Sequence, residues 1–190
     1  MFLRKAAIRP VPKYAVVQEA AIDALEMELE GDDDGLQGAL DAGYRDLDRR
    51  QPHLAEWLAE QVSGRSDELA QSLGYFLAVA VFLAFREAFP RRLGQVDEGG
   101  LRMALDTLST DEQLRADDPL EVLDSDDVVA MGQPVVLEYV QHHLSEALEQ
   151  VGEAANLDEL DRIYRAILVE VIALSHAVEG PPGEANRAMA

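Results

Sequence analysis

Cysteine is absent from this chain of 190 residues. Its absence excludes disulfide bonds, thiolate metal sites and a cysteine nucleophile. A chain of this length buries a hydrophobic core without covalent cross-links, so the missing cysteines do not limit folding. The apolar stretch after Met1 is interrupted by Arg4 and Lys5, which is unlike an export signal. We therefore expect a protein of the reducing cytoplasm.

Basic residues are also scarce, because 16 Lys and Arg stand against 37 Asp and Glu and give a net charge of −21. Such a field repels phosphate backbones and anionic lipid heads, so we expect no binding to nucleic acid or to a membrane surface. A basic partner is favoured instead. The exception is residues 1–13, which hold four basic residues and no acid and are interpreted as a basic N-terminal arm.

Long uncharged runs and strand signals are lacking as well. The longest run without a charge extends from Leu69 to Phe85, which is short for a membrane span and is better explained as a buried central helix. No Asn-Gly or Asp-Gly pair joins two alternating runs. Apolar residues recur instead at intervals of three and four, which predicts an all-α helical bundle or array of about seven to nine helices.

The helical pattern, with proline, glycine and capping residues at its breaks, predicts where the helices begin and end. Ser66 is the expected cap of the fourth helix and Asn156 that of the last. Residues 14–180 are predicted to form one all-α domain, followed by a flexible tail, 181–190. The predicted helices are 14–30, 36–50, 52–63, 66–89, 101–108, two or three turns within 111–131, 134–151, and 157–180.

An internal repeat is the most informative feature of the sequence. The segment from Gln51 to Leu58 reads Gln-Pro-x-Leu-x-Glu-Trp-Leu, and the later segment from Gln133 to Val140 repeats it as Gln-Pro-x-Val-x-Glu-Tyr-Val. Each is followed by a long apolar helix that opens Asp-Glu-Leu, at a somewhat larger offset along the chain. We predict a duplicated helical hairpin with halves of about 14–94 and 95–180, whose long helices lie side by side. The alternative is that two unrelated amphipathic hairpins look alike.

Trp57 and Tyr139 occupy equivalent places in the two copies. We interpret both as core or hinge residues, and the alternative is that they are anchors for a partner protein. Glu138 and His142 lie near Tyr139 on the same predicted helix. If Trp57 and Tyr139 are anchors, these two residues complete the candidate partner-binding set.

The string from Glu30 to Asp41 bears some likeness to a calcium loop of the EF-hand kind. It places oxygen ligands at positions 1, 3, 5 and 12 and Gly35 at position 6. The first ligand is Glu where Asp is usual, and the last is Asp, whose side chain is short for bidentate binding. An acidic linker before the next helix is the favoured interpretation, and a calcium-binding or small-ligand regulator is the alternative.

Catalytic signatures are missing: there is no Gly-rich phosphate loop, no Gly-x-Ser-x-Gly and no His-Glu-x-x-His. A third hypothesis, a helical-bundle enzyme, would use Glu138, His142 and Glu170, the last of which interrupts an apolar run. We expect Glu170 to lie at the edge of the apolar stripe, facing water or an arginine. We predict no catalytic, cofactor-binding or metal-binding residue.

Together these patterns predict a non-enzymatic helical interaction or scaffold protein. Its partner would be another protein with a basic surface, and the alternative is a second copy of the chain in a homodimer. Either would bind in a groove between the two halves.

Overall fold

The structure, a computed structural model, describes residues 11–63, 67–117, 132–151 and 156–182. This part of the chain contains seven α-helices, a short 3-10 helix and no strand, apart from one isolated β-bridge between Leu93 and Val178. The predicted all-α bundle is therefore confirmed. The elements are η1 (Lys13–Ala15), α2 (Glu19–Leu29), α3 (Asp33–Arg50), α4 (Pro52–Val62), α5 (Glu68–Ala88), α6 (Glu98–Asp117), α8 (Pro134–Val151) and α9 (Leu157–Ala177).

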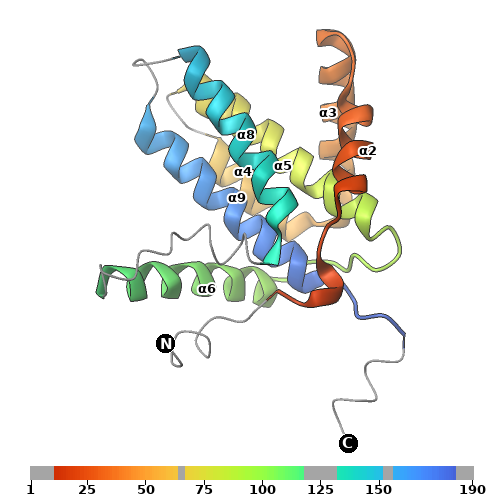
Figure 1. Ribbon diagram of the computed structural model, residues 1–190, viewed down its shortest axis with the longest axis vertical. Coiled ribbons are helices and arrows are strands. Elements are labelled where there is room, and N and C mark those ends of the chain that lie inside the picture. The colour runs from red at the N-terminus through yellow and green to blue at the C-terminus, as the bar shows by residue number, and fades with distance from the viewer. Residues whose placement is uncertain (1–10, 64–66, 118–131, 152–155, 183–190) are drawn as a thin grey trace, which may run out of the picture.

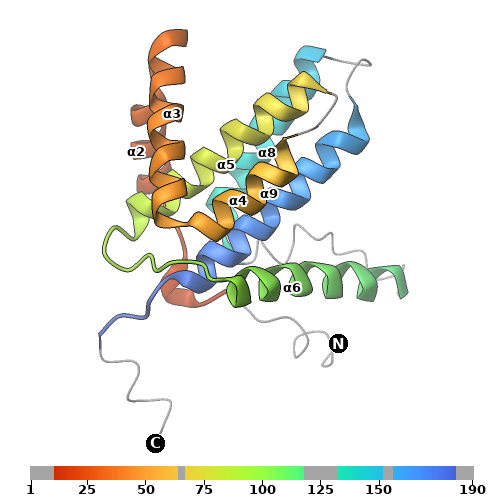
Figure 2. The same ribbon diagram turned by 180° about the vertical axis from the view of Figure 1, so that it is seen from behind.

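Two apolar helices, α5 and α9, pack against each other in the core. Every residue of 77–85 in α5 and of 166–175 in α9 is buried. Helices α4, α5, α8 and α9 run diagonally across the molecule, α2 and α3 stand upright beside them, and α6 crosses one end (Figures 1 and 2). The predicted burial of the two long helices is confirmed, and their apolar faces form the centre of the hydrophobic core.

Helix α5 is long and apolar enough to cross a membrane, but 67% of its most apolar window is buried inside the fold. An apolar helix that is covered by its own chain is typical of a core, because a membrane span exposes its apolar surface to lipid. The burial of α5 is thus compatible with a soluble protein.

Several predicted helix boundaries need correction. Helix α6 has 20 residues instead of the predicted eight of 101–108, because it also takes in residues 98–100 and 109–117. Its early start follows from a cap: the Asp97 Oδ1 accepts a hydrogen bond of 2.7 Å from the Gly100 N–H. The cap of α5 is Asp67 and not Ser66, since Asp67 Oδ1 accepts from the Leu69 N–H at 2.9 Å. The cap by Asn156 is confirmed.

Two more boundaries differ. Helix α3 begins at Asp33, three residues earlier than predicted, with the Asp32 carboxylate accepting from the Gly35 N–H. Helix α9 ends at Ala177, three residues before the predicted end. The predicted turns of 111–131 lie outside the described residues beyond 117, as do most of the basic arm and of the tail.

The first predicted helix, 14–30, is shorter because a glutamine side chain binds the backbone in front of it. Gln133 is fully buried; its Oε1 accepts from the Val17 N–H at 2.9 Å, and its Nε2 donates to the Ala15 carbonyl at 2.6 Å and to Ser175 Oγ at 2.9 Å. Backbone groups engaged in this way cannot join a helical ladder. Helix α2 therefore begins only at Glu19.

Gln51, at the equivalent place in the earlier Gln-Pro segment, also binds backbone groups in front of a helix. It is 1% exposed; its Oε1 accepts from the Val96 N–H at 2.7 Å, and its Nε2 donates to the Gly94 carbonyl at 2.8 Å. We call Gln51 and Gln133 the glutamine clamps. The Gln51 clamp holds residues 94–96, at the predicted boundary between the halves and just before α6, and the Gln133 clamp holds residues 15–17, just before α2.

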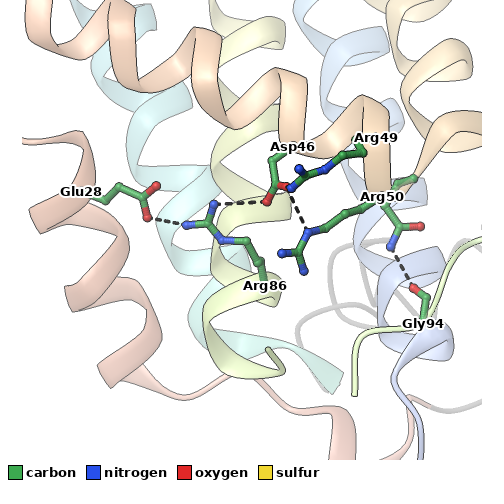
Figure 3. Close-up of polar contacts among 7 residues, drawn as sticks. Glu28, Asp46, Arg49, Arg50, Arg86 and Gly94 are labelled. Carbon is green, nitrogen blue, oxygen red and sulfur yellow. Dashed lines mark hydrogen bonds and ion pairs between the residues drawn. The ribbon is translucent and has the colours of Figure 1, made fainter. Parts of the chain in front are cut away.

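An ionic cluster joins α2, α3 and α5 beside the core. The Arg86 guanidinium on α5 pairs with Glu28 of α2 at 2.6 Å and with Asp46 of α3 at 3.4 Å (Figure 3). Burial raises the pKa of Asp46, but hydrogen bonds from Arg49, Arg50 and Arg86 outweigh it and lower that pKa overall. The cluster fixes α2, whose outer face forms one side of the site described next.

Candidate functional site

A groove lies between α2 of the first half and α8 of the second. It encloses about 320 Å³, and we call it the α2–α8 groove. Each helix contributes four residues, at the first, fourth, fifth and eighth positions of a run, which is one continuous helix face. The lining residues are Glu19, Ile22, Asp23 and Glu26 from α2 and Val135, Glu138, Tyr139 and His142 from α8.

The groove has an apolar floor and an acidic rim. Ile22 and Tyr139 are 8% and 7% exposed and, with half-buried Val135, form the floor. The rim consists of four exposed carboxylates, and none of them forms a salt bridge or hydrogen bond with another side chain among the described residues. No lysine or arginine lines the groove. The rim carboxylates are Glu19, Asp23, Glu26 and Glu138.

Tyr139 is held rigidly at the floor. Its ring packs edge-on against the His143 ring with centroids 4.5 Å apart, and His143 in turn contacts Phe76 of α5 at 4.9 Å. The Tyr139 hydroxyl has no hydrogen-bond partner among the described residues, although the side chain is almost fully buried. Burial, and then the negative charge of Glu26, raise the pKa of Tyr139, so its hydroxyl stays protonated.

Three of the four predicted partner-binding residues, Tyr139, Glu138 and His142, thus line one groove formed by α2 and α8. Tyr139 is at once a buried core residue and part of that lining, so the two interpretations of it do not exclude each other. His142 is mostly exposed and lies 3.6 Å from Glu146. The α2 carboxylates were not singled out, because a charged helix face alone does not say which helix stands opposite it.

Trp57 lines a second groove, formed by α4, α6 and α9 and enclosing about 460 Å³. More of the residues that line this groove are apolar, and its two arginines are already paired. Arg165 binds Glu112 through two hydrogen bonds of 2.6 and 2.7 Å, and Arg162 lies 3.6 Å from Glu159. Each charged residue that lines this groove thus has a partner of opposite charge within the described part of the chain. The residues lining it are Trp57, Gln61, Leu105, Leu108, Arg162, Arg165, Ala166 and Val169.

The loop that the calcium alternative requires is not formed. Residues 33–41 of the acidic string belong to α3, and the Asp32 carboxylate caps that helix. A calcium loop would need these residues wrapped around an ion instead. Among the described residues no group of three or more His, Asp or Glu side chains is arranged to hold a metal ion.

The residues of the enzyme alternative are not brought together. Glu138 and His142 line the α2–α8 groove, whereas Glu170 lines neither groove. The expectation that Glu170 lies at the edge of the apolar stripe is wrong: it is 0% exposed, and neither carboxylate oxygen has a hydrogen-bond partner in the described part of the chain. Burial raises its pKa well above the usual range of a glutamate.

Comparison with known proteins gives no relative: no protein-family model, no curated protein and no solved structure matches this chain. The arrangement of side chains is therefore the only basis for a function.

Proposed function

We propose that this protein is a non-enzymatic, cytoplasmic interaction module that binds a basic segment of a partner protein in the α2–α8 groove. The observation that supports the proposal is the acidic rim, whose four carboxylates face one groove and have no cationic partner among the described residues. Like charges held together in this way repel one another, and a bound cation relieves that repulsion. The net charge of −21 also speeds the approach of a basic partner.

Rim charges alone do not account for tight binding. An exposed ion pair contributes about 0.2–1 kcal/mol, so four pairs supply roughly 1–4 kcal/mol, whereas micromolar affinity needs about 8 kcal/mol. The floor of Ile22, Val135 and the Tyr139 ring adds only a small apolar contribution, because Ile22 and Tyr139 are already more than nine-tenths buried, so most of the apolar surface that binding covers belongs to the partner segment. The partner segment therefore carries apolar as well as basic side chains.

A second copy of the chain is a weaker candidate for the partner. Two bodies of charge −21 repel each other, and the basic arm is the one strongly basic segment that a second copy offers. We therefore propose a different, basic protein as the partner.

The test is a binding measurement by fluorescence anisotropy with a labelled peptide rich in lysine and leucine. The groove variant replaces three rim carboxylates by amides, and the control variant replaces three exposed carboxylates on α3, α4 and α5 outside the groove, so both change the net charge equally. We expect the groove variant to bind about tenfold more weakly, from roughly 0.5 kcal/mol for each lost pair. The groove variant is Glu19→Gln, Asp23→Asn and Glu26→Gln, and the control is Asp48→Asn, Glu56→Gln and Glu87→Gln.

The control variant should bind within about twofold of the wild type, and the affinity of the wild type should fall as salt is added. Equal losses in the two variants would show that the overall field, and not this groove, attracts the peptide. That result would contradict the proposal.

A further inference from the structure

The two sides of the α2–α8 groove share one geometry. Helix α2 presents Glu19 to Glu26 and helix α8 presents Val135 to His142, in each case at the first, fourth, fifth and eighth positions. Each row covers two helical turns, about 10 Å along the helix axis. Two helices that present such faces toward a common space leave the place of a third helix open.

An extended segment fits this space poorly. Its side chains alternate between two opposite faces at steps of about 3.3 Å. The groove instead repeats its chemistry once per helical turn, apolar at Ile22 and acidic at Glu19, Asp23 and Glu26. A helix with the same period meets each of these positions. It can place apolar residues on the floor and basic residues against the rim.

Tyr139 gives a second and independent sign of a ligand. Its side chain is more than nine-tenths buried, with 7% exposed, it lines the groove, and its hydroxyl has no hydrogen-bond partner in the described part of the chain. The hydroxyl oxygen itself is not sealed inside the core, so a ligand in the groove can reach it. A protonated tyrosine oxygen accepts a hydrogen bond from an ammonium or guanidinium group, and Lys and Arg carry that group at the end of a stem long enough to pass the rim.

We propose that the partner segment is a basic amphipathic α-helix that lies between α2 and α8, with one Lys or Arg side chain donating a hydrogen bond to the Tyr139 hydroxyl. This inference rests on the proposed function, because it specifies the form of the segment that the same groove takes. The rim carboxylates pair with the other basic side chains of that helix.

The first experiment compares two peptides of about 18 residues with the same composition of Lys, Leu, Ala and Gln. In one, Lys and Leu are spaced to form the two faces of a helix; in the other, the order is scrambled so that no face forms. We expect the amphipathic peptide to bind about tenfold more tightly, and ¹³C labels in that peptide to show helical Cα shifts when it is bound.

Equal affinities for the two peptides would overturn the inference while leaving the proposed function intact, because the groove would then take basic chains of any form. Binding of neither peptide would overturn both. The same two results therefore separate the failure of the inference from the failure of the function.

The second experiment uses Tyr139→Phe with Tyr75→Phe as its matched control. The Tyr75 hydroxyl already has partners within the chain, Asp41 at 3.3 Å and the Leu40 carbonyl at 3.4 Å, and it does not line the groove. We expect Tyr139→Phe to weaken binding of the amphipathic peptide by about three- to tenfold, and Tyr75→Phe to leave it unchanged. Thermal melts of both variants show whether each is folded. Unchanged affinity in a folded Tyr139→Phe variant would overturn the assigned hydrogen bond.

Discussion

Two buried side chains whose polar groups have no partner stand out among individual residues. Tyr139 lines a groove and its hydroxyl is open to a ligand there, whereas both carboxylate oxygens of Glu170 are sealed inside the core and the residue lines neither groove. An ionised carboxylate without a partner is very costly in such surroundings, so the folded chain holds Glu170 in its protonated form over a wider pH range than the unfolded chain does. Glu170 is therefore a source of instability near neutral pH.

The Glu170→Gln variant tests this account. Because burial raises the folded-state pKa, the stability connected with this group is fully present below the unfolded-state pKa and is lost as pH rises toward the folded-state pKa. Glutamine does not titrate, so we expect the variant to gain on the wild type as pH rises, by up to about 1.4 kcal/mol per pH unit. Urea unfolding of both proteins from pH 5 to pH 8 measures the difference. A difference that is constant with pH would rule out burial of an unpaired acid.

At the scale of single elements, α3 offers a matched pair of glycines. A Cβ added at Gly43 would lie 2.6 Å from Val79 Cγ1 and 3.2 Å from Leu83 Cδ1 of α5, whereas at Gly38 nothing lies within 4 Å. Helix α3 therefore lies close against α5 at Gly43, whereas Gly38 faces open space. Both glycines lie in the same helix, so they share the same gain in helix propensity on replacement by alanine.

We expect Gly38→Ala to stabilise the protein by about 0.5–1 kcal/mol, because alanine favours the helix. Gly43→Ala should destabilise it by about 1–3 kcal/mol, because the new methyl group overpacks the contact with Val79. Urea denaturation of the two variants gives both values. If both substitutions stabilise the protein, α3 and α5 do not pack as closely as the structure shows.

The glutamine clamps carry the second prediction about elements. Gln133→Ala leaves the Val17 N–H and the Ala15 carbonyl buried without partners, and we expect a loss of about 2–4 kcal/mol. Gln71 is exposed on α5, so Gln71→Ala should change stability by less than about 0.5 kcal/mol. Guanidinium denaturation measures both free energies of unfolding. If Gln133→Ala and Gln71→Ala both changed stability by less than about 0.5 kcal/mol, water would be satisfying the Val17 N–H and the Ala15 carbonyl as well as Gln133 does.

Sequence patterns predict elements well where the signal is local. Pro52 and Pro134 begin α4 and α8 as predicted, and Asn156 caps α9, because these residues act on their own helix turn. The early start of α6 and the late start of α2 were missed. The first depends on a cap that overrides two glycines, and the second on a clamp from a residue 116 positions away in the chain.

The candidate site was predicted in part for the same reason. Tyr139, Glu138 and His142 share one helix face, which the sequence alone reveals by their spacing. Their opposition to Glu19 and Glu26 depends on how α2 packs across the molecule, and no local pattern contains that information. The fully buried position of Glu170 was missed because a single acid in an apolar run usually turns toward water.

At the scale of the whole molecule, the duplication stays a prediction, and the contacts of the two Gln-Pro segments are compatible with it. The Gln133 clamp holds residues 15–17 before α2, and the Gln51 clamp holds residues 94–96 before α6. Each Gln-Pro helix also lines a groove with one of these two helices: α8 with α2, and α4 with α6. Helices α5 and α9 are equally long, but they begin at different places relative to the Asp-Glu-Leu sequence. Helix α9 begins at Leu157, one residue before that sequence, and α5 begins at Glu68, its second residue. The two grooves differ in charge, and we propose that only the α2–α8 groove serves the basic partner.

The central claim is that this acidic groove is where a basic segment binds. Backbone NMR of the ¹⁵N-labelled protein, titrated with the amphipathic lysine-leucine peptide, locates the contact directly. The account predicts that the largest shift changes fall on residues 19–26 and 135–142, with little change around Trp57 in the other groove. Changes that centre on Trp57, or that spread evenly over the acidic surface, would contradict it.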